Sequence, residues 1–178
     1  FIKRLRAGEV EGHLTFSMEL IVLIIVSVWQ ALRFDQAGCV VLRDMKPSNI
    51  FVGDTGEVYF ADWGVACIVG EATMDAVQTT IDDDLVLQGS LIGTPLYMSP
   101  EQLVGEESIT AQSDVYSLCA VTYELLSLVH YLGPKPPDNL FDLLEAALAD
   151  TRTDAEAYLH ALNCRVPRSL SRILRKGL

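Results

Sequence analysis

The segment from Gln112 to His130 restricts the possible folds most strongly, because it carries apolar residues on nearly every side. A helix that is apolar all round needs other elements on every side to remove it from water. Gly133 and Pro134 follow the segment and indicate where it ends. The sequence therefore predicts a central helix enclosed by one domain, and half of its 178 residues are hydrophobic, which suffices for such a core.

Further helices are expected around this one. Between Met18 and Gln36 the β-branched residues favour a strand, whereas the length of the run and its tail favour a buried helix, which we expect here. Thr153 and Glu156 have the spacing of a capping box at the start of another helix. The remaining predicted helices are Asp138 to Ala149, Thr153 to Leu162 and Arg168 to Lys176.

Short β-structure is predicted before the central helix. The runs Cys39 to Leu42 and Ile50 to Val52 are apolar, and Glu57 to Ala61 alternates between apolar and polar residues. The sequence Gly-Asp-Thr-Gly at 53–56 joins the last two runs and predicts a hairpin turn. We expect a fold that is mainly α with a small β-hairpin, and an irregular loop from 64 to 93 that is either functional or disordered.

Charge and cysteine placement exclude several classes of protein. The 24 acidic and 13 basic side chains give a net charge of −11, which disfavours nucleic acid as a partner. The four cysteines lack the spacing of a zinc site, so we interpret them as reduced thiols in a cytoplasmic chain. The apolar run from Leu20 to Trp29 is shorter than the roughly 20 residues of a membrane span, and we expect none. Because the chain starts at Phe1 without a leader pattern, we expect an internal fragment.

Four polar residues are predicted to converge at one edge of the β-structure. Asp44, Lys46 and Asn49 lie in the loop between two predicted strands, and Asp62 follows the hairpin strand that returns to the same edge. Carboxylate and amide oxygens are ligands that Mg²⁺ prefers, and a lysine adds positive charge for a phosphoryl group. Each residue alone also has a structural interpretation, as a turn carboxylate, a solvated lysine or an Asx-turn.

Four motifs stand in the order that is typical of protein kinases. They are RDxKPxN at 43–49, Asp-Trp-Gly at 62–64, GTPLYMSPE at 93–101 and SDVYSL at 113–118. The chain resembles the C-terminal lobe of bacterial serine/threonine kinases of the Pkn type. This resemblance implies part of a two-lobed α+β fold, a partial kinase domain over residues 1–178, a catalytic loop at 42–49 and an activation segment at 62–101.

The resemblance also implies a role for each polar residue. Asp44 would be the catalytic base, Lys46 would contact the γ-phosphate of ATP, and Thr94 would bond both of them beneath the incoming hydroxyl. Asn49 and Asp62 would hold the Mg²⁺ that bridges the ATP phosphates. A lysine two places after the base is the arrangement of serine/threonine kinases, so we expect protein substrates with Ser or Thr hydroxyls.

Arg43 resembles the arginine that binds a phosphate on the activation loop. Candidate acceptors are Thr79, Thr80 and Ser90, and such charge-assisted pairs order a loop. The alternative is that Arg43 pairs with one of the aspartates at 82–84, or that these are a solvated run.

Two further sets of residues have both a structural and a family interpretation. Asp114 opens the central helix as an N-cap, and the matching kinase aspartate bonds the backbone of the catalytic loop; both roles can hold at once. Four apolar residues would form the hydrophobic spine beneath the adenine, or else serve as ordinary packing. They are Ile50, Phe51, Val121 and Leu125.

Departures from the kinase pattern predict a weaker enzyme rather than a different fold. Leu42 replaces the usual histidine and Trp63 the usual phenylalanine, and Met45 and Cys119 are also unusual at their positions. Glu101 normally pairs with a later arginine that is not clearly placed here, so we expect an unpaired and costly carboxylate.

Three functions remain open from the sequence. A Gly-rich phosphate loop and a Val-Ala-Ile-Lys strand are not found ahead of the matched motifs, so we expect little phosphoryl transfer from this chain by itself. The first function is a serine/threonine protein kinase, and the second is a non-catalytic binding module of the same fold. The third is a small-molecule kinase, which would not need the GTPLYMSPE segment.

Overall fold

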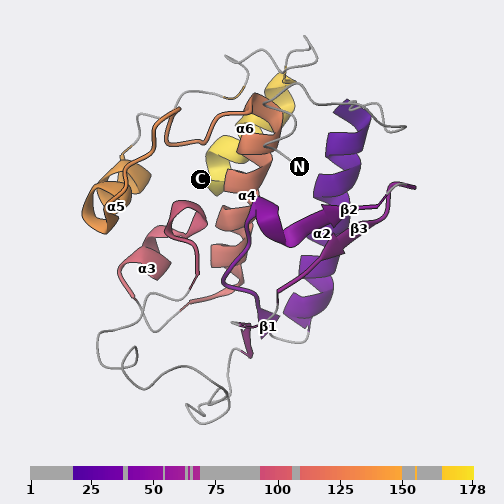
Figure 1. Cartoon of the computed structure of the whole chain (residues 1–178), viewed down its shortest axis with the longest axis horizontal. Helices are drawn as coiled ribbons and strands as arrows, with labels where there is room; N and C mark the ends of the chain where they lie inside the picture. The colour runs from indigo at the N-terminus through magenta and orange to yellow at the C-terminus, as the bar shows by residue number, and fades with distance from the viewer. Residues whose placement is uncertain are drawn as a thin grey trace.

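The computed structural model describes residues 18–37, 40–53, 55–62, 64, 66–68, 93–105, 109–149, 155 and 166–178. Helices predominate in this part of the chain, and short antiparallel strands complete it. Figure 1 shows helix α4 in the middle, with α2 beside it and α6 crossing its upper part, and both helices contact α4. The fold class is therefore mainly α with a small β-component, as the sequence predicts.

Helix α4 (Ala111–Ser127) is the buried centre that the apolar pattern predicts. Nearly all of its residues from Ser113 onward are buried, and Thr110 caps the helix by accepting a hydrogen bond from the Gln112 amide at 3.4 Å. The predicted end at His130 is wrong, because Leu128 takes the left-handed conformation with φ of 57°. A left-handed residue stops the helical hydrogen-bond pattern. His130 then pairs with Gly133 in an isolated β-bridge.

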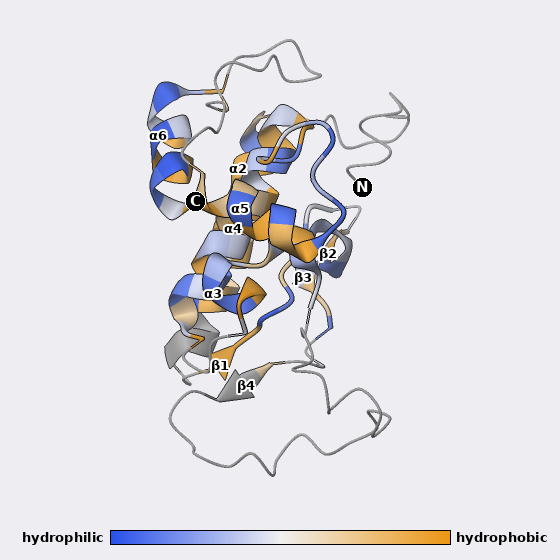
Figure 2. Ribbon diagram, turned by 90° about the vertical axis from the view of Figure 1, so that its left-hand side faces the viewer, coloured by the Kyte–Doolittle hydropathy of each residue, from blue (hydrophilic) through white to orange (hydrophobic). Residues whose placement is uncertain are grey.

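Helices α2 (Met18–Ala37) and α6 (Arg168–Gly177) cover two sides of α4. The interpretation of 18–36 as a helix is confirmed, and Ile21, Ile24 and Leu32 form part of its buried face. Figure 2 shows hydrophilic residues along α6 at the outside of the molecule. Gly177 at its end lies against Cys119, where a side chain would collide with the sulfur, so α6 packs closely on α4.

The predicted hairpin is confirmed. Strand β2 (Ile50–Val52) pairs antiparallel with β3 (Val58–Phe60), with Phe51 opposite Tyr59. Gly56 has a φ of 94°, which the turn requires and which glycine adopts without strain. A second antiparallel pair joins β1 (Val40–Val41) to β4 (Cys67–Ile68). The expectation of irregular structure from residue 64 is wrong at 67–68, because β1 supplies a partner for this short segment.

Short helices complete the side of the molecule near α3 (Figure 1). The 3-10 helices are η1 (Pro47–Asn49) and η3 (Pro95–Tyr97), and α3 (Pro100–Leu103) follows η3 without having been predicted. Helix α5 (Leu140–Leu148) begins after Asn139, whose side chain accepts from the Asp142 amide, rather than at 138. It packs on α3 through a small apolar cluster of Met98, Leu103 and Ala147. The predicted helix at 153–162 lies outside the described residues apart from Ala155.

None of the helices in the described ranges is both long and apolar enough to cross a membrane.

Candidate active site

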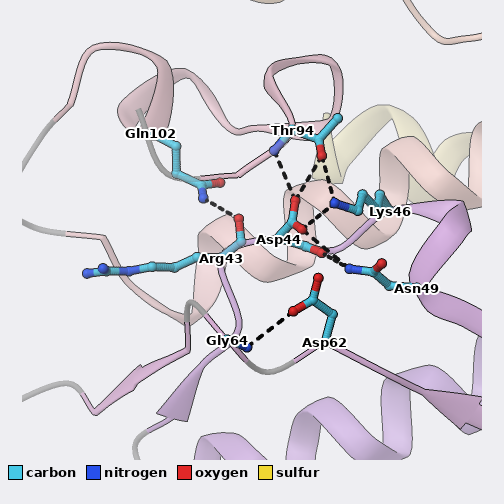
Figure 3. Close-up of polar contacts among 8 residues, drawn as sticks. All are labelled: Arg43, Asp44, Lys46, Asn49, Asp62, Gly64, Thr94 and Gln102. Carbon is cyan, nitrogen blue, oxygen red and sulfur yellow. Dashed lines mark hydrogen bonds and ion pairs between the residues drawn. The ribbon is translucent and has the colours of Figure 1, made fainter. Parts of the chain in front are cut away.

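The loop between β1 and β2 holds the Asp44 carboxylate against the segment that precedes η3. Asp44 is 7% exposed. Its Oδ1 accepts hydrogen bonds from the Thr94 amide at 2.9 Å and the Thr94 hydroxyl at 3.0 Å, and its Oδ2 accepts from Lys46 Nζ at 2.5 Å (Figure 3). Donors on both oxygens restrict the orientation of a carboxylate. The site therefore contains a fixed, shielded carboxylate.

Lys46 and Asn49 complete the contacts around Asp44. Lys46 Nζ also donates to Thr94 Oγ1 at 3.0 Å, so one ammonium joins the two sides of the site. Asn49 Nδ2 donates to the Asp44 carbonyl oxygen at 3.0 Å and lies 3.4 Å from the Oδ2 atom of the Asp44 carboxylate. Because these bonds use the amide nitrogen of Asn49, its side-chain oxygen is left as an acceptor. The bonds that the sequence predicts between Thr94, Asp44 and Lys46 are thus present.

Gly93 lets the Thr94 segment approach the loop between β1 and β2 this closely. Its φ is 122°, and an added Cβ would lie 2.8 Å from the Met98 side chain and 3.0 Å from the Arg43 carbonyl oxygen. A side chain here would meet both a strained backbone and a crowded site. Glycine is therefore the residue that this contact requires.

The backbone of Arg43 is held from two helices. Asp114 of α4 accepts from the Leu42 amide at 2.8 Å and the Arg43 amide at 3.0 Å. On the other side, Gln102 of α3 donates to the Arg43 carbonyl oxygen at 2.9 Å. These bonds fix Arg43 at a φ of 66°, an unfavourable conformation for a residue with a long side chain. We call this set of bonds the backbone clamp.

The two interpretations of Asp114 are thereby separated. Its carboxylate bonds the loop that follows β1, and the N-cap role is wrong because Thr110 caps α4. Gln102 was not predicted, because a glutamine in a short helix gives no local signal of a partner 59 positions away. The clamp thus depends on one predicted and one unpredicted residue.

The Arg43 side chain extends away from Asp44 and Lys46, as Figure 3 shows. Its Nε is buried and has no hydrogen-bond partner in the described part of the chain. The predicted phosphate acceptors Thr79, Thr80 and Ser90, and the alternative aspartates at 82–84, all lie outside the described residues. The phosphate-binding role of Arg43 remains a prediction.

Asp62 lies on the open side of the site. It follows β3, is exposed, and has a φ of 72°, which aspartate tolerates better than most residues. Its Oδ1 accepts from the Gly64 amide at 3.3 Å, and Figure 3 shows the carboxylate directed towards Asp44 and Asn49. The structure therefore brings together the four polar residues that the sequence selects.

The Asn49 and Asp62 side chains fit a magnesium ion. Among the described residues Asp62 accepts one long hydrogen bond, which leaves further lone pairs of its carboxylate for a ligand, and Asn49 offers its amide oxygen. Mg²⁺ is usually held by one or two carboxylates together with waters and phosphate oxygens. In the described ranges no group of three or more His, Cys, Asp and Glu side chains is placed to hold a metal. The donor set therefore suits a cation that is shared with a phosphorylated ligand.

A cavity of about 700 Å³ adjoins the site and was not predicted. Two hydrogen bonds lie in the wall of this cavity. Glu124 accepts from the Tyr97 hydroxyl at 2.6 Å, and a ring nitrogen of His130 donates to the Leu96 carbonyl oxygen at 2.9 Å. The one available signal was Glu124 itself, a carboxylate in the mostly apolar second half of α4. Residues lining the cavity include Lys46, Thr94, Leu96, Tyr97, Glu124 and His130.

Within the described residues a serine hydroxyl, rather than an arginine, bonds Glu101. Its carboxylate accepts a hydrogen bond from the Ser113 hydroxyl at 2.6 Å. Burial alone would raise the pKa of Glu101, but hydrogen bonds from Ser113, from its own backbone and from Ser99 outweigh it, and the pKa lies below the usual value. The partner was missed because it lies at the start of α4, 12 positions along the chain.

The unusual residues at the other motif positions are accommodated in the core. Leu42 is 2% and Met45 is 1% exposed. Burial raises the pKa of the Cys119 thiol to about 11, so this cysteine is protonated at neutral pH. Trp63 lies outside the described residues.

The four apolar residues considered as a spine do not share one environment. Ile50, Val121 and Leu125 are buried in the main core. Phe51 is 54% exposed, so ordinary core packing does not explain it.

Comparison with known proteins assigns the family. The family model that describes the protein kinase domain matches residues 4–160. The chain belongs to the protein kinase family. The described site residues from Asp44 to Thr94 all lie within the matched range.

Curated relatives are bacterial serine/threonine kinases. The chain is 32% identical over 127 residues to the serine/threonine-protein kinase PknD of Protochlamydia amoebophila. This match covers 68% of this chain and 13% of that protein. It is 38% identical over 104 residues to PknB of Mycobacterium tuberculosis, covering 58% of this chain and 15% of that protein. A probable serine/threonine-protein kinase of Streptomyces coelicolor is 36% identical over 112 residues, and the match covers 62% of this chain and 15% of that protein.

The chain thus matches only about one seventh of the length of these relatives. Protein kinases use ATP and Mg²⁺ and phosphorylate proteins, and these properties define the family to which the chain belongs.

Proposed function

We propose that this chain provides the phosphoryl-transfer residues of a serine/threonine protein kinase, which moves the γ-phosphate of ATP to a Ser or Thr hydroxyl of a protein. The observation that carries the proposal is the Asp44 carboxylate, held by Thr94 and Lys46, which both line the adjoining cavity. A carboxylate in a fixed orientation, bonded by two residues of a cavity wall, suits the transfer of a proton from an alcohol.

Asp44 is the base in this proposal, and it accepts the hydroxyl proton as the oxygen attacks phosphorus. The bond from the γ-phosphorus to the bridging oxygen of ATP breaks, and ADP leaves with that electron pair. Lys46 contributes a positive charge beside the phosphoryl oxygens, and Thr94 keeps Asp44 and Lys46 in position through its two contacts. These roles are electrostatic and positional.

Asn49 and Asp62 hold Mg²⁺ in this proposal. The ion, when bound, neutralises charge on the phosphates. The exposure of Asp62 supports this role, and so does the length of the hydrogen bond that it accepts from Gly64 within the described residues, since such a carboxylate is able to coordinate an ion.

The cavity beside Lys46 and Thr94 is proposed to receive the substrate polypeptide. Its walls combine aliphatic residues with Glu124 and the bonded Tyr97 hydroxyl, a mixture that suits a peptide segment better than a nucleotide. The net charge of −11 argues against a nucleic-acid substrate. A reduced, buried Cys119 agrees with the cytoplasm as the proposed location.

Nucleotide titration tests the site directly. We expect millimolar Mg²⁺ and ATP together to shift the backbone amide NMR signals of Asp44, Lys46, Asn49 and Asp62, and Asp62→Asn to remove the dependence on Mg²⁺. Glu145→Gln, at an exposed position on α5, is the control. Signals that do not respond would contradict the proposal and support the non-catalytic binding module.

Phosphate transfer is measured separately, with radiolabelled ATP and a mixture of protein substrates. The prediction that the 178-residue chain by itself transfers little phosphate is checked in the same assay. Any transfer that occurs is expected to fall at least 100-fold in Asp44→Asn, because the base is lost. Transfer that Asp44→Asn leaves unchanged would exclude Asp44 as the base.

A further inference from the structure

Helix α2 carries a large apolar surface on the side that faces away from the core. Val22, Leu23, Val26 and Trp29 are 43%, 48%, 43% and 39% exposed. Single exposed apolar side chains are ordinary, whereas a contiguous group on one face of a helix marks an interaction surface. None of these residues belongs to the candidate active site, so an inference about this surface does not depend on the proposed activity.

The exposed residues of α2 form one continuous face. At about 100° per residue they fall within an arc of roughly 120° on the helix. Glu19 begins the face, the four apolar residues occupy its middle and Arg33 ends it. The full set is Glu19, Val22, Leu23, Val26, Trp29, Gln30 and Arg33, and we call it the outer face of α2.

The spacing along this face suits another helix. Glu19, Val22, Val26, Trp29 and Arg33 follow one another at alternating steps of three and four residues. This alternation is the seam along which two helices pack at a small crossing angle. A second helix is therefore a better occupant than a flat surface.

The charged residues at the two ends of the outer face, Glu19 and Arg33, favour a second copy of α2 as the partner and an antiparallel orientation of the two helices. An antiparallel second copy of α2, with Val26 on the two-fold axis, places Leu23 opposite Trp29 and Glu19 opposite Arg33. Both ends then carry opposite charges across the interface. A parallel copy would place Glu19 beside Glu19 and Arg33 beside Arg33, which is unfavourable.

We propose that two copies of this chain associate through the outer faces of their α2 helices, packed antiparallel around Val26. The contact is isologous, so each residue pair occurs twice around the axis and the assembly closes as a dimer. One helix face per copy is a small interface, and such interfaces give weak, concentration-dependent complexes. We expect a monomer at about 1 μM and measurable dimer at roughly 100 μM, by comparison with other small interfaces.

The first test is sedimentation velocity of the 178-residue chain over this concentration range. Val26→Arg brings two like charges together on the axis and is expected to raise the dissociation constant at least tenfold. The matched control is Ile173→Arg, which changes a 61% exposed residue on α6 and should leave association unchanged. Circular dichroism confirms that both variants remain folded.

Charge exchange tests the antiparallel arrangement. Glu19→Arg alone and Arg33→Glu alone each create like-charge pairs, and each should raise the dissociation constant several-fold at low salt. The chain with both substitutions restores opposite charges in reversed order, and its dissociation constant should return close to the original value.

Several outcomes would overturn the proposal. A chain that stays monomeric at the highest concentration has no such dimer. Association that Val26→Arg does not weaken uses another surface, and failure of the double substitution to restore binding excludes the antiparallel pairing. A monomer that binds neutral phosphatidylcholine vesicles through Val26 would assign this face to a lipid surface instead.

Discussion

Two aspartates of the candidate site, Asp44 and Asp62, have opposite environments. Asp44 is buried, and donors on both sides of its carboxylate hold it in place. Asp62 is exposed, and the Gly64 amide at 3.3 Å bonds it weakly. Residues of the chain therefore fix the orientation of the proposed base. The orientation of the proposed metal ligand is expected to become fixed when an ion binds.

This difference has a physical reason. A general base must point in one direction before the substrate arrives, so its orientation has to come from the protein. A metal ligand gains its orientation when the cation binds, and strong hydrogen bonds beforehand would compete with the cation. Substitutions on the Asp44 side should therefore change stability, and those at Asp62 should change ligand binding.

The largest effect on stability is expected at the backbone clamp. Asp114→Asn places an amide group against the Leu42 and Arg43 amides, so one buried donor loses its acceptor and the charge-assisted bond is lost. We expect a decrease of about 2–4 kcal/mol in the free energy of unfolding. Urea unfolding of this variant measures it, with the exposed Glu145→Gln as control. A decrease equal to that of the control would show that the clamp contributes little.

Gly93→Ala should have the next largest effect. The added methyl group would collide with the Met98 side chain and the Arg43 carbonyl oxygen at a positive φ, and we expect about 1–3 kcal/mol of destabilisation. Gly56→Ala is the matched control, because Gly56 also has a positive φ but has no neighbouring atom within 4 Å of the new group. Equal losses in thermal unfolding would mean that strain, and not crowding at the site, sets the effect.

Thr94→Val should have a smaller effect. It removes the hydroxyl that donates to Asp44 and accepts from Lys46 but keeps the shape and the backbone amide. We expect a loss of about 1 kcal/mol, which Thr94→Ser should largely avoid because it keeps the hydroxyl. Chemical denaturation compares the two variants, and identical stabilities would show that the hydroxyl contacts do not hold the site together.

Asp62→Asn should change stability by less than about 0.5 kcal/mol, since surface substitutions rarely do more. Its effect should appear instead in the Mg²⁺-dependent NMR shifts described above. Isothermal unfolding with and without Mg²⁺ and ATP separates the two quantities. A large loss of stability without ligand would remove the contrast between the two aspartates.

The smallest effect is a pH dependence at Glu101. Its folded-state pKa lies below the usual 4.5, so this carboxylate contributes stability above that pH and loses the contribution as pH falls through the folded pKa. Glu101→Gln should therefore reduce the loss of stability on acidification below about pH 4.5. Urea midpoints at several pH values provide the measurement, and an unchanged acid limb would contradict it.

Local patterns were enough to predict much of the fold and the core of the site. The hairpin follows from two short runs around a Gly-containing turn, and α4 follows from a long apolar segment. Asp44, Asn49 and Asp62 were selected because they stand at strand ends, which meet in space even when they are distant in sequence.

Features that depend on distant partners escaped prediction. The β1–β4 pair is two residues long, and its stability comes from the partner strand rather than from its own sequence. The contacts Gln102 to Arg43 and Tyr97 to Glu124 join segments 59 and 27 positions apart, and no local pattern identifies them. The end of α4 was misplaced because Leu128 adopts a conformation that its residue type does not favour.

The backbone clamp also bears on how the molecule folds. Asp114 lies 72 and 71 positions from the Leu42 and Arg43 amides that it bonds, so this contact closes a long stretch of chain. Long loops are costly to close early, and the loop between β1 and β2 is therefore expected to become ordered late, after α4 has docked. Hydrogen exchange at these two amides should then be as slow as exchange in α4 itself, because opening either one requires the helix to separate from the loop.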